Sequence, residues 1–434
     1  MSHPRNVILI GIDALRADHL GCYGYRRNTS PAIDLLSKEG ILFEKCFSQA
    51  PNTTPSFMSM LTSLYPTYHG VTSIMGATGM HGRTYILDKS IPTLAEVLKS
   101  HSFRTGAFTD GGQLFGKIGF ERGFDYYSMN PHRLHKKEGS IQEDEILYWL
   151  KEYRSERFFM FFHSYAAHSP WMAPEEFWGL YDNGSRAHFS MRSFVGDTDL
   201  SHLDSMDLYP HFYRRVNKLI PADVEYVKAL YDGGIRYLDN FINRLWNHLH
   251  DLKIASETIV VITADHGEEF MDHGKLTHEQ LYAETLHVPL IVLAPNMPRG
   301  IRIDQTARSI DIFPTILDLL DIQLPAPIHG VSLVPSLERE LGLATIAEAE
   351  RSGYMYQNNK YKYIYPFHKP TRIRTDELYD IETDPREKKN IALENLDLVE
   401  ELMYQYITEL HRPNHALPRR GVIYPELQKS SHDF

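Results

Sequence analysis

The chain has 434 residues, of which 42% are hydrophobic, and a formal net charge of -11. This composition is typical of a globular protein with a large core, and the negative charge disfavours general nucleic-acid binding because no basic surplus exists to neutralise phosphates. Only two cysteines occur, Cys22 and Cys46, so a disulfide framework and a cysteine-based zinc site are excluded.

The first element is a short aliphatic run, residues 7–12, that ends in Asp13. The run is much shorter than the ~20 apolar residues of a membrane helix and is unlike a signal peptide. We therefore expect a cytoplasmic protein with no membrane partner. Its β-branched residues are typical of a strand covered on both faces, and such strands place ligand-binding residues at their carboxyl ends.

Strands and helices alternate along the rest of the first three quarters of the chain. Three predicted strands end in polar residues of the ligand type: Asp13, His163 and the pair Asp265-His266. The alternation predicts an α/β fold, a mostly parallel sheet with helices on both faces. Further strands are expected at 104–109, 158–163, 256–264 and 288–293, and helices at 30–38, 55–63, 91–99, 142–153 and 223–250.

The pattern changes beyond Pro325, where tyrosine-rich runs suggest short strands and residues 396–410 suggest a helix. We expect a catalytic domain over residues 1–325 and a small C-terminal antiparallel α+β subdomain over 326–434, with a closing helix and a tail. The polar stretch 183–221 is expected to form a long excursion over the site.

Four residues could hold one divalent cation. Asp13, Asp265 and His266 follow strand ends, and Thr53 begins a helical pattern whose N-terminus favours negative charge. Carboxylate, imidazole and hydroxyl groups form a hard, mixed site, and a metal there would lower the pKa of the hydroxyl. The simpler alternative is that Thr53 is a helix cap and that the other residues form caps and turns.

Several motifs together resemble the sulfatase family of the alkaline phosphatase superfamily, nearly end to end and in the family's order. They are residues 6–24, Thr53-Thr54-Pro55-Ser56 with His69-Gly70-Val71, Ala264-Asp265-His266-Gly267-Glu268, residues 286–291, and Glu377-Leu378-Tyr379-Asp380 with Asp384-Pro385. The resemblance implies an alkaline-phosphatase-like fold and metal ligation by Asp13, Asp265 and His266.

The resemblance also places Thr53 at the nucleophile position. Sulfatases carry there a cysteine or serine that becomes formylglycine, followed by Pro and Arg, whereas this chain has Pro55 and Phe57. No formylglycine is therefore expected, and a threonine nucleophile is similar to that of phosphodiesterase-type members. Ala14 replaces a second family aspartate, so manganese or zinc is expected in the site, with calcium or magnesium as the alternatives.

Two histidines are further candidates for catalysis. His168 matches the family histidine that protonates the leaving group. His278 falls where sulfatases carry an anion-binding lysine, and could bind substrate oxygens or complete a second metal site. His163 could be a further ligand or a packing residue.

The expected activity is metal-dependent hydrolysis of a small anionic ester, either a phosphate diester or a phosphonate ester, by Thr53. One alternative is a sulfuric ester hydrolase on the same scaffold. Another is a catalytically weak or dead metal-binding relative. The head group of the substrate and any homo-oligomer are left open by the sequence.

Overall fold

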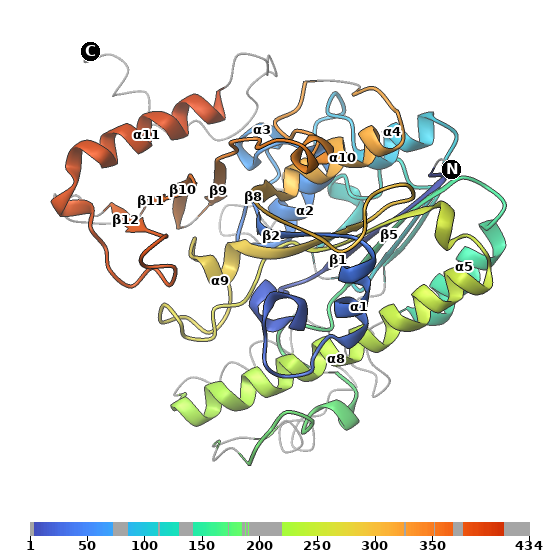
Figure 1. Cartoon of the computed structure of the whole chain (residues 1–434), viewed down its shortest axis with the longest axis horizontal. Coiled ribbons are helices and arrows are strands. Elements are labelled where there is room, and N and C mark those ends of the chain that lie inside the picture. Colours follow the sequence, from blue (N-terminus) through green and yellow to red (C-terminus); the bar gives the residue numbers. More distant parts are fainter. Residues whose placement is uncertain are drawn as a thin grey trace.

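The computed structural model contains two sheets, a large mixed one and a small antiparallel one (Figure 1). The structure describes residues 4–72, 86–111, 113–129, 142–171, 173–184, 187, 190, 219–324, 327–350, 352–367 and 376–411. The boundary expected at 325–326, most of the 183–221 excursion and the tail beyond 411 lie outside these residues.

The large sheet has eight strands in the order β4-β3-β5-β1-β6-β7-β2-β8. Only β7 runs against the others, so the mostly parallel sheet is confirmed. The bounds are β1 Asn6–Ile12, β2 Ile41–Phe47, β3 Arg104–Thr109, β4 Tyr126–Met129, β5 Phe158–Ser164, β6 Thr258–Ala264, β7 His287–Leu293 and β8 Ile301–Arg308.

The register of the central strands aligns their carboxyl ends. Ile12 of β1 pairs with Ser164 of β5 on one side and with Ala264 of β6 on the other. All three strands are buried along their whole length, as their continuous apolar runs predict. Asp13 and Asp265, each one residue further on, are therefore neighbours at one edge of the sheet.

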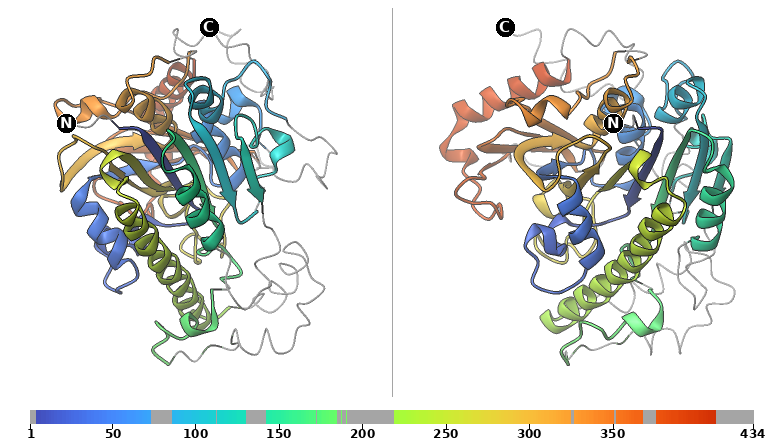
Figure 2. Two further views of the ribbon diagram at one scale, coloured as in Figure 1. Left: turned by 90° about the vertical axis from the view of Figure 1, so that its right-hand side faces the viewer. Right: turned by 45° about the vertical axis from the view of Figure 1, so that its right-hand side comes forward.

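Helices cover both faces of this sheet (Figures 1 and 2). The helices α1, α5 and α8 lie on one face, and α2, α3, α4 and α10 lie on the other. This arrangement confirms the predicted architecture. The bounds are α1 Pro31–Glu39, α2 Thr53–Thr62, α3 Pro66–His69, α4 Leu94–Ser100, α5 Glu143–Tyr153, α8 Pro221–Asp251, α9 Ala283–Leu286 and α10 Ile312–Leu319.

The C-terminal part forms a four-stranded antiparallel sheet in the order β12-β11-β10-β9, beside helix α11 (Figure 1). A buried arginine ties it to the large sheet. Arg308, at the end of β8, bonds Asp311 at 2.8 Å and Glu409 of α11 at 3.3 Å. The bounds are β9 Thr345–Ala349, β10 Gly353–Gln357, β11 Tyr361–Pro366, β12 Glu377–Asp380 and α11 Leu396–Leu410.

Four strands, β2, β4, β8 and β9, were not predicted from the sequence. Charged residues interrupt β2 and β8, both of which lie at one end of the large sheet. Their hydrophobic pattern is therefore weaker than that of the buried central strands. No helix among the described residues has the length and apolar character that crossing a bilayer requires.

Candidate active site

Two carboxylates project from adjacent strand ends into a buried site. Oδ1 of Asp265 accepts hydrogen bonds from the main-chain N–H of Ala14 at 3.1 Å and of His266 at 2.9 Å. Among the described residues, no hydrogen-bond donor reaches Oδ2 of Asp265 or Oδ1 of Asp13, although both atoms are buried. Two buried anionic oxygens without donors need a cation or protons to compensate them.

His266 presents a ring nitrogen to these oxygens. Its Nδ1–H donates to the carbonyl of Gly267 at 2.8 Å, which leaves a lone pair on Nε2. This Nε2 lies 3.6 Å from Oδ1 of Asp13 and 3.3 Å from Oδ2 of Asp265. A backbone carbonyl that fixes the tautomer in this way is typical of metal-binding histidines.

The ligand atoms of Asp13, Asp265 and His266 all lie within 4.8 Å of one another, and all three side chains are fully buried. Burial, together with the nearby Asp265 carboxylate, raises the pKa of Asp13 well above its ordinary value. A divalent cation would remove this electrostatic cost, because it replaces the lost solvation of both carboxylates. The donor set fits a metal, as the sequence predicted, and it is compatible with a hard or borderline cation.

Helix α2 brings Thr53 to this cluster. The Thr53 hydroxyl donates to Nε2 of His266 at 3.3 Å, whereas the hydroxyl of Thr54 donates to the carbonyl of Gln113 at 3.0 Å. Thr53 is the first residue of α2 and Asn52 is its N-cap, so Thr53 does not cap the helix with its side chain. The two threonines are therefore distinct, and only Thr53 faces the carboxylates.

The two candidate catalytic histidines lie beside the cluster. Nε2 of His168 is 3.8 Å from Oδ1 of Asp13, and the ring of His278 is tilted against that of His266 with centroids 4.1 Å apart. Burial lowers the pKa of His278 to about 4 and that of His168 well below its usual value. The structure thus brings together all six candidate residues, but it does not test their roles.

His163 donates from Nε2 to Oδ2 of Asp13 at 3.1 Å. His266 faces Oδ1 of Asp13, whereas His163 binds Oδ2. His163 therefore orients the carboxylate of Asp13. The ring of Phe57 packs edge-on against His163 with centroids 5.2 Å apart. Phe57 occupies the position where sulfatases carry an arginine, so an apolar ring stands there in place of a cation.

Glu268 is a site residue that the sequence reasoning did not single out. Its Oε1 accepts the Nδ1–H of His278 at 3.0 Å, and burial raises the pKa of Glu268 to about 8. The motif around Asp265-His266 already contained this acid two residues after the histidine. Its contact with His278, ten residues away, depends on the path of the loop between them. No pattern of residues in the sequence predicts that contact.

The family model of the sulfatases ("Sulfatase") matches residues 5–322 of the chain. The chain belongs to the sulfatase family. A second model, "N-sulphoglucosamine sulphohydrolase, C-terminal", matches residues 271–413. This family protein is accordingly a hydrolase that acts on ester bonds, as the sequence predicted.

Known relatives of this sulfatase-family chain are distant in sequence. Arylsulfatase K from Rattus norvegicus is 23% identical over an alignment 482 positions long. The alignment covers 99% of this chain and 80% of the relative. A solved structure in complex with its substrate, D-glucosamine-2-N,6-O-disulfate, has a TM-score of 0.75 and 20% identity, covering 95% of this chain and 100% of that one. A phosphonate monoester hydrolase of Agrobacterium radiobacter has a TM-score of 0.73 and 18% identity, with 94% and 95% covered.

Proposed function

We propose that this sulfatase-family protein hydrolyses phosphate diesters or phosphonate monoesters, with the hydroxyl of Thr53 as the nucleophile. The observation that carries the proposal is the position of Thr53. Its Oγ1 is 3.3 Å from the predicted metal ligand His266, at the first residue of helix α2. Formylglycine is made from cysteine or serine, so the threonine hydroxyl itself would have to attack.

The residues around Thr53 support attack on a charged ester. The first N–H groups of α2 lack intrahelical partners and can bind the oxygens of an anionic substrate. A divalent cation held by Asp13, Asp265 and His266 would supply Lewis-acid polarisation of the ester and favour ionisation of the hydroxyl. We assign to His168, whose Nε2 lies 3.8 Å from Oδ1 of Asp13, the transfer of a proton to the leaving oxygen. An anionic ester bound beside the ring would favour its protonated form, which burial alone disfavours.

Hydrolysis of a sulfate ester is a second candidate for the same site. It is supported by the match to two sulfatase-type family models and by the names of the relatives. The phosphorus candidate is supported by the threonine nucleophile, by the apolar Phe57 in place of an arginine, and by the likeness to a phosphonate monoester hydrolase. Both candidates use the same carboxylates and histidines.

A substrate panel with a matched pair of variants tests the proposal. The purified protein, loaded separately with manganese, zinc, calcium or magnesium, would be assayed on bis-p-nitrophenyl phosphate, p-nitrophenyl phenylphosphonate and p-nitrophenyl sulfate. Thr53→Ala should lower kcat at least ~10³-fold, because the attacking atom is gone. Thr54→Ala removes only a hydrogen bond to the Gln113 carbonyl and should retain turnover.

Attack by Thr53 expels one p-nitrophenolate, so mass spectrometry of the quenched reaction should then find a p-nitrophenylphosphoryl group on Thr53 from the diester, or a phenylphosphonyl group from the phosphonate. Preference for p-nitrophenyl sulfate would select the second candidate. Turnover that survives in the Thr53→Ala protein would refute the threonine mechanism for either substrate class. Metal binding without turnover of any ester would select the inactive relative.

A further inference from the structure

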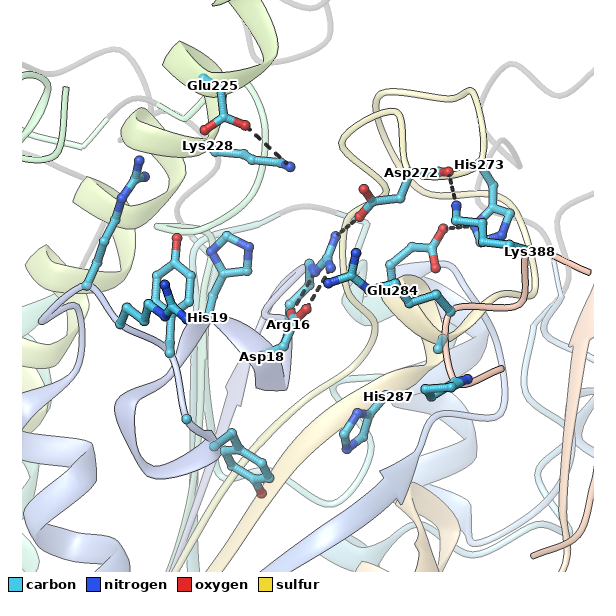
Figure 3. A pocket seen from close by; sticks show the side chains of 18 residues that line it. Arg16, Asp18, His19, Glu225, Lys228, Asp272, His273, Glu284, His287 and Lys388 are labelled. Atoms are coloured by element: carbon cyan, nitrogen blue, oxygen red, sulfur yellow. Dashed lines mark hydrogen bonds and ion pairs between the residues drawn. The ribbon is translucent and has the colours of Figure 1, made fainter. Parts of the chain in front are cut away.

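A charged pocket lies outside the cluster of Thr53 and the predicted metal ligands. Its volume is about 780 Å³, within the range of small-molecule sites. Four segments that are distant in sequence build it, as Figure 3 shows: residues 16–27 after β1, the first turns of α8, residues 272–287, and residues 385–388. We call it the arginine pocket because Arg16 lies at its centre.

Arg16 and the Glu268 main chain separate the arginine pocket from the catalytic cluster. Nη1 of Arg16 donates to the carbonyl of Glu268 at 2.9 Å, while the carboxylate of Glu268 accepts from His278. Arg16 is held there by Asp18 at 2.8 Å and Asp272 at 2.9 Å. The charge of Arg16 is thus compensated, and these contacts fix the position of its side chain at the boundary of the pocket.

The cationic side chains that line the arginine pocket outnumber the acidic ones. Within the part of the chain that the structure describes, the one ion pair of Lys228 is a long contact of 3.7 Å with Glu225. Nζ of Lys388 donates to the main-chain carbonyl of Asp272 at 2.6 Å. The lining includes six cationic and four acidic side chains: Arg16, Arg26, Arg27, Lys228, Arg386 and Lys388 against Asp18, Glu225, Asp272 and Glu284.

Two of the arginines have no ion pair within the described part of the chain. Arg26 and Arg386 both line the pocket and are exposed, and no described carboxylate reaches either of them. Arg27, by contrast, bonds the buried Asp232 at 2.7 Å. Arg26 comes from the loop before α1 and Arg386 from the C-terminal part, so two uncompensated guanidinium groups from separate segments line one cavity of a protein with a net charge of -11.

This arrangement selects a particular kind of ligand. Guanidinium groups recognise phosphate and sulfate oxygens through paired N–H donors. Because Arg26 and Arg386 line the same cavity, a ligand with two anionic groups can contact both. A long polyanion is disfavoured, because four carboxylates line the same pocket and the whole protein is negative.

We propose that the arginine pocket binds a small molecule carrying two phosphate or sulfate groups, with Arg26 and Arg386 as its main contacts. Binding here does not depend on the identity of the nucleophile or on turnover. The shared chemistry is a pair of tetrahedral oxyanions on a compact, hydroxyl-rich scaffold.

Isothermal titration calorimetry on the metal-loaded full chain tests this. The probes are fructose 1,6-bisphosphate, a heparin disaccharide with two sulfates, and fructose 6-phosphate as the single-group control. We expect at least one of the first two to bind at least tenfold more tightly than the control, with an affinity that falls as salt rises. The tighter of the two identifies phosphate or sulfate as the preferred group.

Variants locate the binding. R26Q/R386Q should weaken the affinity at least tenfold, whereas R299Q, which alters an exposed arginine paired with Glu39, should not. D265N alters a predicted metal ligand and is therefore compared with the wild-type protein with metal removed from both. It separates this pocket from the catalytic cluster and should leave the affinity unchanged in that comparison. Equal binding of the single-group control, unchanged affinity in R26Q/R386Q, loss of affinity in D265N, or no binding of either doubly charged probe would overturn the proposal.

Discussion

Asp265→Asn should make the metal-free protein more stable while abolishing its stabilisation by metal. The substitution keeps the shape of the side chain, and the amide oxygen can still accept from the main-chain N–H groups of Ala14 and His266. The new amide nitrogen replaces the buried oxygen Oδ2, which has no donor among the described residues. This nitrogen can donate a hydrogen bond to the carboxylate of Asp13, whereas the original carboxylate oxygen of Asp265 repels it.

The magnitude follows from the geometry of the cluster. The ligand atoms of Asp13 and Asp265 lie within 4.8 Å of each other. Two full charges at that separation repel by about 3.5 kcal/mol at an effective dielectric constant of ~20. Because a proton on Asp13 already relieves part of this repulsion, we expect the metal-free variant to gain about 1–3 kcal/mol.

Urea unfolding with and without EDTA measures both effects. The wild-type protein should gain about 2.7 kcal/mol when the metal is present at a hundred times its dissociation constant, and the variant should gain almost nothing. A metal-free Asp265→Asn protein that is less stable than the metal-free wild type, or one that is still stabilised by metal, would refute the cation site. Asp18→Asn, a matched change at a carboxylate already paired with Arg16, should not stabilise the protein.

Three further outcomes are expected. His168→Asn should slow hydrolysis of an alkyl ester by ~10²-fold or more but affect a p-nitrophenyl ester less, since only a poor leaving group needs the proton; equal effects in steady-state assays would exclude that role. Burial lowers the pKa of His69 from 6.5 to about 3, so the unfolded state takes up the proton first and stability falls as pH drops below about 6.5. His69→Asn should remove up to about 1.4 kcal/mol per pH unit of that fall in urea titrations between pH 6.5 and 4, and an unchanged slope would contradict it. Lys362→Met, which leaves the buried Glu387 without its 2.7 Å partner, should cost roughly 3–5 kcal/mol of unfolding free energy, whereas exposed Lys360→Met should cost nothing; equal losses would refute the buried pair.

The strong periodic elements could be predicted from the sequence. Strand β3 and helix α11 have the predicted bounds, and the central strands begin or end within two residues of the prediction. Their signal is local, because a fully buried strand must be apolar throughout and an amphipathic helix must repeat its apolar face. Strand β2 carries charges and depends on β7 and β8 as partners, so its own residues could not identify it.

The sequence alone determined the residue types of the site and their places at strand ends: Asp13 after β1, Asp265 and His266 after β6, and Thr53 at the start of a helix. It determined them because parallel strands carry ligands at their carboxyl ends, and the motifs of the family mark those ends. Tertiary structure alone decided the contacts between segments, such as the pairing of Glu268 with His278 and the hydrogen bond from His163 to Asp13. Such contacts join residues ten to 150 positions apart. They depend on sheet register and loop path, and neither is set by a local pattern of residues.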